Sequence, residues 1–424
     1  MVDAAAILRS PATIRERCRN IAAAVEAGES RHFRIDRSRL PDVAERVVRV
    51  TRQRYPDGRI PLHSRWRHFE AGGVDRKSEL DACIATRTTV GMARACVECV
   101  LVSVLLDAGA GPDWHYTEPG TGLRLARSEG LGVASLRAFL DGRFSSDMGD
   151  RCRADAKALR RLQASDLGAI FQVSDSNPIV GLEGRAALLR RLGDALQSQP
   201  EQFTSDGLPG HLFDVLTHHR HAHHLPHANL HHLPPSTFRH QVTAARVLET
   251  VLEAFGSIWP SGQSLEDGTP LGDVWRHPAA GGAGKSAGWV PFHKLSQWLT
   301  YSLLEPFEWA GVAVTGLDEL TALPEYRNGG LLLDGGVIVP RDPACLDRVM
   351  TPGEEWVVEW RALTVALIDD LAPLVREQLG MTAESMPLAR ILEGGTWAAG
   401  RQIAQEMRPQ GAPPVRIESD GTVF

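Results

Sequence analysis

Lysine is scarce in this sequence of 424 residues: only four are present among 46 basic side chains, and arginine supplies the rest. The net charge is −6 and the isoelectric point is about 6.2. A nucleic-acid partner would require a basic face, so this balance favours a small-molecule substrate and no nucleic acid. The scarcity also makes a lysine inside a polar segment worth attention, and Lys294 is the one that lies in such a segment.

Long apolar runs are absent as well. No segment has the length of a membrane span, and the first residues lack the basic start of a signal peptide. The six cysteines are scattered and suggest no disulfide framework. Cys96 and Cys99 form a Cys-x-x-Cys inside the apolar run Val90–Leu106, but no second pair completes a zinc site, so we expect buried helix cysteines. We therefore expect a cytoplasmic protein without membrane contact, bound metal or cofactor.

Two conspicuous segments resemble ligand sites but lack the context of one. The run His218–His232 holds eight of the sixteen histidines; its proline and low complexity favour an exposed loop, with adventitious or storage metal binding as the alternative. Ala279–Ser286 resembles a phosphate-binding loop, but Ala279 replaces the first glycine and no strand precedes it. We expect a flexible glycine loop at the border of the active site.

Apolar residues recur at helical spacing over much of the chain, which predicts a mainly α protein with a large core. The best alternating pattern is Gly330–Pro340, which predicts a small β-hairpin with its turn at Asp334-Gly335, and Val415–Phe424 predicts a weaker one. The helical segments are Ala154–Leu162, Gly184–Leu196, Val242–Phe255, Phe292–Leu304, Trp356–Leu379 and Leu388–Met407.

A first polar constellation opens a predicted helix. Pro291 suits the first position of that helix, and Lys294, Gln297 and Tyr301 follow at i, i+3 and i+7 on one line. His293 precedes the lysine. The helix dipole disfavours a lysine in the first turn, which suggests that Lys294 holds an anion or a carboxylate. A solvated helix start is the alternative.

A second constellation follows about thirty residues later. Glu325, Tyr326, Arg327 and Asn328 place an acid, a phenol, a guanidinium and an amide side by side, just before two glycines. Glycine permits close approach of a ligand to the backbone, and arginine suits forked contacts with phosphate or carboxylate. The alternative is an ion-paired loop that closes the hairpin.

Other polar and aromatic residues complete a set suited to a small phosphorylated or glycosidic ligand. Charges inside an apolar helix indicate either a buried pair or a site. The residues are Asp273, Trp275 and His277, the helix pair Glu359 and Arg361, the i, i+4 pair Glu393 and Trp397, and Tyr116 in a polar aromatic loop.

Four segments resemble the uracil-catabolism family of the fungal and bacterial route that opens the pyrimidine ring and passes through ribosylurea. The resemblance runs along nearly the whole chain, although the histidine tract departs from it. The segments are Phe171–Arg185, Val290–Leu304, Leu323–Asp334 and Leu392–Arg401.

A more distant resemblance is to the queuosine-salvage nucleotide N-glycosidases, over roughly residues 155–400. It rests on Phe292-His-Lys-x-x-Gln297, on Pro324-Glu-Tyr-Arg327 and on Glu359-Trp-Arg361, in the same order and spacing. It implies a fold like that of the helical DNA glycosylases. It also implies hydrolysis of an N-ribosyl bond by a carboxylate and a lysine, with Glu in place of the family's Asp. We therefore expect a helical region over 1–150 and an N-glycosidase-like helical domain over 151–424, joined as one intimate unit.

These roles form a mechanism. Cleavage of a ribosyl C1′–N bond builds positive charge on the sugar, and Glu325 would stabilise it and take a proton from water. Lys294 would pair with Glu325 or hold a 5′-phosphate, Arg327 and Arg361 would clamp phosphate or ribose, and Asp273 or Glu393 would protonate the leaving urea. Aromatic walls would come from Trp275, Trp397 and Tyr116, with His293, Gln297, Tyr326, Asn328 and Glu359 as further substrate contacts.

The leading hypothesis is therefore a hydrolase that converts ribosylurea, or its 5′-phosphate, to urea and the sugar. One alternative is an amidohydrolase that acts on the opened uracil ring in the same pathway. The other is a non-catalytic scaffold for a pathway partner. The sequence does not indicate an oligomeric state.

Overall fold

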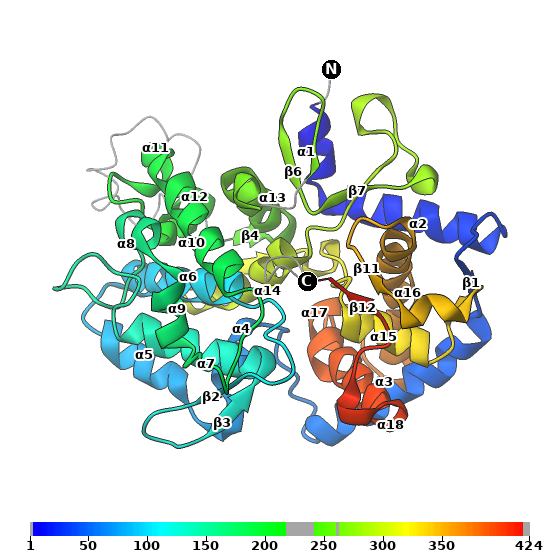
Figure 1. Cartoon of the computed structure of the whole chain (residues 1–424), viewed down its shortest axis with the longest axis horizontal. Coiled ribbons are helices and arrows are strands. Elements are labelled where there is room, and N and C mark those ends of the chain that lie inside the picture. Colours follow the sequence, from blue (N-terminus) through cyan, green and yellow to red (C-terminus); the bar gives the residue numbers. More distant parts are fainter. Residues whose placement is uncertain (1–2, 218–240, 260–262, 419–424) are drawn as a thin grey trace.

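Helices dominate the computed structural model of the chain, which describes residues 3–217, 241–259 and 263–418. The prediction of a mainly α fold with small β elements is confirmed. In Figure 1 the middle of the chain, cyan to green, gathers on the left, whereas both ends, blue and orange to red, gather on the right. Helix α14 (Lys294–Trp309) lies between the two groups.

The helices agree with the apolar periodicity of the sequence, and each predicted helical segment contains one. Their bounds before α14 are α1 Ala4–Leu8, α2 Pro11–Glu26, α3 Leu40–Arg54, α4 Arg65–Phe69, α5 Arg76–Ile84, α6 Thr89–Leu105, α7 Arg127–Leu140, α8 Ala156–Arg161, α9 Ala164–Ile170, α10 Leu182–Gln197, α11 Pro200–Phe203, α12 Leu212–Thr217 and α13 Ala244–Phe255. After it come α15 Tyr326–Asp334, α16 Glu355–Leu379, α17 Leu388–Ile391, a π-helical turn Leu392–Thr396 and α18 Trp397–Met407.

The strands form two-stranded pairs, and half of these pairs join distant parts of the chain. Antiparallel pairs join β1 (Phe33–Ile35) to β10 (Ile338–Pro340), β2 (His115–Thr117) to β3 (Arg124–Ala126), β5 (Gln263–Ser264) to β6 (Pro270–Gly272), and β7 (Val274–Arg276) to β8 (Trp289–Pro291). Parallel pairs join β4 (Gln241–Thr243) to β9 (Ala313–Thr315) and β11 (Val349–Met350) to β12 (Arg416–Ile417).

The hairpin predicted over Gly330–Pro340 is wrong, and most of the hairpin predicted over Val415–Phe424 lies outside the described residues. Tyr326–Asp334 is helix α15, and the strand after it pairs with β1 instead of folding back on itself. The buried run Leu331–Leu333 fits a helix as well as a strand, and the cap that Glu325 provides selects the helix. Near the chain end, β12 pairs with β11, and residues 419–424 lie outside the description.

One hydrophobic core extends from Ile14 to Val415. Helices α2 and α3 pack against α16, and α6 packs against α14, so segments from both expected regions, 1–150 and 151–424, meet in the same core. A smaller cluster places α1 under the strands around Leu271 and Trp289.

The cysteines differ in part from expectation. Cys96 and Cys99 are buried and free, as predicted for α6. Cys83 and Cys152 form a disulfide, which could not be predicted because 69 positions separate the two residues and only the fold brings them together. None of the helices in the described part of the chain is both long and apolar enough to cross a membrane.

Of the two segments that resembled ligand sites, the structure describes only the glycine-rich loop. The histidine-rich run 218–232 lies outside the described residues. The loop Ala279–Ser286 contains two short 3₁₀ turns, and its Ala280 carbonyl accepts hydrogen bonds from Arg17 and Asn20 of α2. It packs on α2 and supplies none of the described residues that line the cavity of the candidate active site below.

Candidate active site

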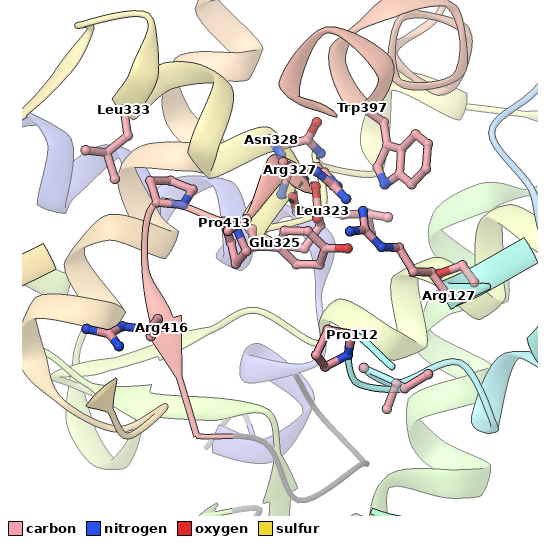
Figure 2. A pocket seen from close by; sticks show the side chains of 18 of the residues that line it. Pro112, Arg127, Leu323, Glu325, Arg327, Asn328, Leu333, Trp397, Pro413 and Arg416 are labelled. Atoms are coloured by element: carbon pink, nitrogen blue, oxygen red, sulfur yellow. Dashed lines mark hydrogen bonds between the residues drawn. The ribbon is translucent and has the colours of Figure 1, made fainter. Parts of the chain in front are cut away.

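A cavity of about 1050 Å³ lies where several helices begin. Arg127 starts α7, Lys294 starts α14 and Tyr326 starts α15, and all three residues line it. Figure 2 shows Arg127 and Arg327 reaching into the same space beside Trp397, the first residue of α18. The unpaired N–H groups at helix starts favour negative charge nearby, so the cavity suits a ligand with electron-rich oxygens.

Glu325 lies at the centre of this arrangement and caps α15. Its carboxylate accepts hydrogen bonds from the backbone N–H of Arg327 and Asn328, both at 2.6 Å. Burial raises the pKa of Glu325 above its ordinary value, although these two hydrogen bonds and the charge of Lys294 act in the other direction. The cap fixes the carboxylate at the cavity wall and leaves lone pairs free for a ligand or a water.

Lys294 approaches the cavity from the start of α14. The helix begins three residues later than predicted, because Trp289–Pro291 forms strand β8 and His293 is the cap. His293 has a φ of 48°, a strained conformation for a residue with a side chain, and its ring contacts the Leu8 carbonyl at 2.9 Å. Burial and the charge of Arg361 lower the pKa of Lys294, against the influence of Glu325 and Asp273.

Asp273 supports this helix start from behind. Its carboxylate accepts the backbone N–H of Lys294 at 3.0 Å and the indole N–H of Trp275 at 2.7 Å, and both its oxygens pair with Arg361 at 2.8 and 2.7 Å. Burial would raise the pKa of Asp273, but Arg361 and these hydrogen bonds hold it well below its ordinary value.

The predicted roles of this group therefore change. A fully paired, ionised carboxylate has no proton to donate at neutral pH, so Asp273 is a positioning residue and not the acid that we expected. Arg361 forms this ion pair, and its guanidinium carbon packs over the Phe292 ring, 4.1 Å from the ring centroid. Its side chain is therefore not placed as a substrate clamp. Trp275 braces Asp273 and, like these two residues, is not among the described residues that line the cavity.

Replacing Asp273 by Asn should strongly destabilise the fold. Arg361 is fully buried, and breaking a buried ion pair costs about 3–5 kcal/mol because one charge stays behind without compensation. Guanidinium-induced unfolding measures the loss. The matched control is Asp42→Asn, which breaks the exposed pair with Arg39 and should cost at most about 1 kcal/mol. An equally small loss for both variants would contradict the supporting role of Asp273.

Arg327 is a cavity residue with buried N–H groups that lack hydrogen-bond acceptors among the described residues. The residue is 2% exposed, and its Nε and Nη1 have no hydrogen-bond partner among the described residues. Its guanidinium lies 4.7 Å from the ring of Tyr326 and 5.8 Å from that of Trp397. The side-chain oxygen of Asn328 is likewise buried without a described partner. Leaving such groups unpaired is costly, which indicates a site for a polar ligand.

Other predicted contacts lie away from the cavity lining formed by the described residues. Glu359 bonds to Ser30 and to His277. Gln297 and Tyr301 both form hydrogen bonds to Thr321. They therefore do not face the cavity with Lys294, although the sequence placed all three on one line of the helix. These groups are structural, because their partners belong to the protein itself.

Glu393 and Tyr116 also lie outside the lining of the cavity. Burial opposes ionisation of Glu393, but His63 at 2.9 Å and Arg54 at 2.9 Å lower its pKa to about 2. It is therefore ionised and unsuited to the role of acid that we expected. Burial and the nearby Glu118 raise the pKa of Tyr116 to about 12, and this residue belongs to β2 outside the lining.

The structure adds cavity residues that the sequence did not suggest. Asp107, His63, His68, Trp298 and Arg127 all line the same space. Asp107 had one usable signal, since it is a lone acid between an apolar helix and a glycine-containing loop. The histidines and Arg127 had none, because single polar residues in or beside helices are common on any surface. In the described ranges, no three His, Cys, Asp or Glu residues gather as a metal site.

Comparison with known proteins gives the chain a family. Residues 7–424 match the family described as "Protein of unknown function (DUF1688)". "Uracil catabolism protein 4" of Lachancea kluyveri is 36% identical over 445 residues, covering 98% of both chains. "Protein urg3" of Schizosaccharomyces pombe is 38% identical over 430 residues, covering 100% of this chain and 99% of that one. The chain therefore belongs to the DUF1688 family, over nearly its whole length.

Proposed function

We propose that this protein is a hydrolase of uracil catabolism that cleaves the N-ribosyl bond of ribosylurea, or of its 5′-phosphate, to give urea and the sugar. The name of the Lachancea relative supports the pathway. The observation that carries the reaction is the pair Glu325 and Lys294, which approach one cavity from two helix starts and whose pKa values shift toward each other.

The chemistry requires a base, an acid and charge stabilisation. As the C1′–N bond lengthens, positive charge builds on the ribose, and an adjacent carboxylate stabilises it. Water forms the new C1′–O bond and gives a proton to Glu325, while the departing urea nitrogen takes a proton from Lys294. The raised pKa of Glu325 and the lowered pKa of Lys294 favour both transfers, and a proton passed from the acid to the amine restores the starting state.

Substrate binding falls to the groups around this pair. The unpartnered N–H groups of Arg327 suit ribose hydroxyls or a 5′-phosphate. Arg127 reaches into the same space from α7, and Tyr326 and Trp397 offer flat faces against the sugar. Asn328 contributes a buried amide oxygen that can accept a ribose hydroxyl.

Product analysis tests the reaction. The purified chain, given ribosylurea and its 5′-phosphate in parallel, should release urea and the free sugar in equal amounts. Release of carbon dioxide or ammonia would instead identify an amidohydrolase acting on the opened ring. Absence of turnover with both compounds would favour a binding role.

The pH dependence should show both shifted groups. If catalysis needs the Glu325 carboxylate, activity falls as the pH drops through its raised pKa, so the acid limb of kcat/KM should lie above 4.5. If it needs the Lys294 ammonium, activity falls as the pH rises through its lowered pKa, so the alkaline limb should lie below 10.5. Lys294→Arg keeps its charge to higher pH but is a much poorer proton donor, so kcat should fall and the alkaline limb of the remaining activity should move upward. An alkaline limb left in place would contradict the assignment.

A further inference from the structure

Asp107 is a buried acid in the cavity that the mechanism above does not use. It follows α6, its side chain is 7% exposed, and it lines the cavity together with Lys294. One oxygen, Oδ2, pairs with Arg65 Nη1 at 2.8 Å and accepts the indole N–H of Trp298 at 3.1 Å. The other oxygen, Oδ1, is buried and has no hydrogen-bond partner within the described part of the chain.

The partner groups hold this carboxylate in a fixed orientation. Arg65 is fully buried, and its other N–H groups bond to the Ser103 hydroxyl at 2.8 Å and to the Ser128 carbonyl at 3.0 Å. Trp298 of α14 donates its indole N–H to Oδ2 as well. A carboxylate tied at one oxygen presents the other as a fixed acceptor, and a buried acceptor without a donor is costly.

A histidine shares the Arg65 Nη1 nitrogen with this carboxylate. His68 of α4 lines the same cavity and contacts the same Arg65 nitrogen at 3.0 Å through its Nδ1. A guanidinium can only donate, so Nδ1 accepts and the proton of the neutral ring is on Nε2. Burial, with Arg65 next in effect, lowers the pKa of His68 and keeps this ring neutral. The subsite thus offers one acceptor, Asp107 Oδ1, and one donor, His68 Nε2.

We propose that Asp107 and His68 form the subsite for the leaving group, and that it selects a urea or primary amide. The N–H groups of the ligand donate to Asp107 Oδ1, and its carbonyl oxygen accepts from His68 Nε2. This inference rests on the proposed function, since it assigns one end of that substrate. Lys294, Glu325 and Asp107 line the same cavity. In this proposal, a urea held at Asp107 directs its glycosidic nitrogen toward the Lys294 ammonium.

Binding of N-methylurea to the full chain tests the subsite without turnover, because the methyl carbon stands where C1′ of the ribose would lie. Saturation-transfer NMR should detect its methyl group on the wild-type protein, and tetramethylurea, which has no N–H, should not bind. Asp107→Asn replaces the acceptor by a mixed donor and acceptor, and should weaken N-methylurea about tenfold or more, the effect of a hydrogen bond to a charged group. Asp113→Asn, an exposed acid in the same loop, should bind as the wild type does.

Two further variants keep the result decisive. His68→Phe keeps an aromatic ring at this position and removes the donor Nε2 together with the Nδ1 that contacts Arg65, so it should also weaken binding, and it carries the test if Asp107→Asn fails to fold. Glu325→Gln should leave N-methylurea binding intact. No binding to the wild type, or unchanged binding to both subsite variants, would overturn the proposal.

This result is separable from that of the hydrolase proposal. A chain that binds N-methylurea through Asp107 but releases no urea from ribosylurea would refute the reaction alone. A chain that hydrolyses ribosylurea without binding N-methylurea would refute the subsite alone.

Discussion

Glu325→Gln is expected to lower kcat by about 10²–10⁴-fold, the contribution of a positioned acid or base, while the fold persists. The amide cannot take a proton from water, and it places no negative charge beside C1′. Substrate binding should change little, because Arg327 and the leaving-group end are left in place. Single-turnover kinetics with ribosylurea and its 5′-phosphate, together with thermal unfolding, measure both effects.

Stability needs its own control here, since Glu325 also caps α15. Losing a helix cap costs about 0.5–2 kcal/mol, and part of this is offset because burial already disfavours the ionised acid. Asp75→Ala removes a cap of the same kind from α5, on the surface, and should cost similar stability without loss of turnover. Equal activity of the Glu325→Gln variant and the wild type would refute the catalytic role.

Arg327→Met is expected to lower kcat/KM by about 100-fold or more, the effect of two hydrogen bonds from a charged group, and to leave the protein as stable as before or more stable. The guanidinium is buried with two nitrogens unpartnered in the described structure, so removing the charge relieves a cost that only a bound ligand repays. Steady-state kinetics and denaturant unfolding of the same preparation provide the two readings.

Arg185→Met provides the contrast for this prediction. Arg185 is also fully buried, but its nitrogens donate to the carbonyls of Leu106, Ala108 and Gly109. Its loss leaves buried carbonyls without partners, so the free energy of unfolding should fall by a few kcal/mol. Comparable destabilisation by Arg327→Met, or undiminished kcat/KM, would show that Arg327 is structural and not part of a binding site.

Helix positions could be predicted from the sequence because apolar periodicity reports directly on which face is buried. The start of α14 and the nature of α15 could not, since both depend on tertiary partners. Asp273 supplies acceptors for the backbone N–H groups of Phe292, His293 and Lys294, which ends β8 and delays the helix. The disulfide of Cys83 and Cys152 likewise depends on contacts between distant segments.

The candidate site likewise divides into residues that local sequence indicates and residues whose partners only the fold reveals. Lys294 could be identified because the helix dipole disfavours a lysine in the first turn. Glu325 could be identified because it opens a run of four polar side chains just before two glycines. Glu359 and Arg361 do not line the cavity. A charge inside an apolar helix indicates a buried partner, and that partner can belong to the protein or to a ligand. Here the partners are His277 and Asp273, both within the protein.

A structure of the Glu325→Gln variant with uncleaved ribosylurea 5′-phosphate bound would show where the scissile bond lies. We expect the anomeric carbon to lie against the side chain at position 325, with the urea directed toward Asp107 and Lys294 and the phosphate toward Arg327. A sugar bound outside this cavity, or one whose anomeric carbon faces away from position 325, would contradict this expectation.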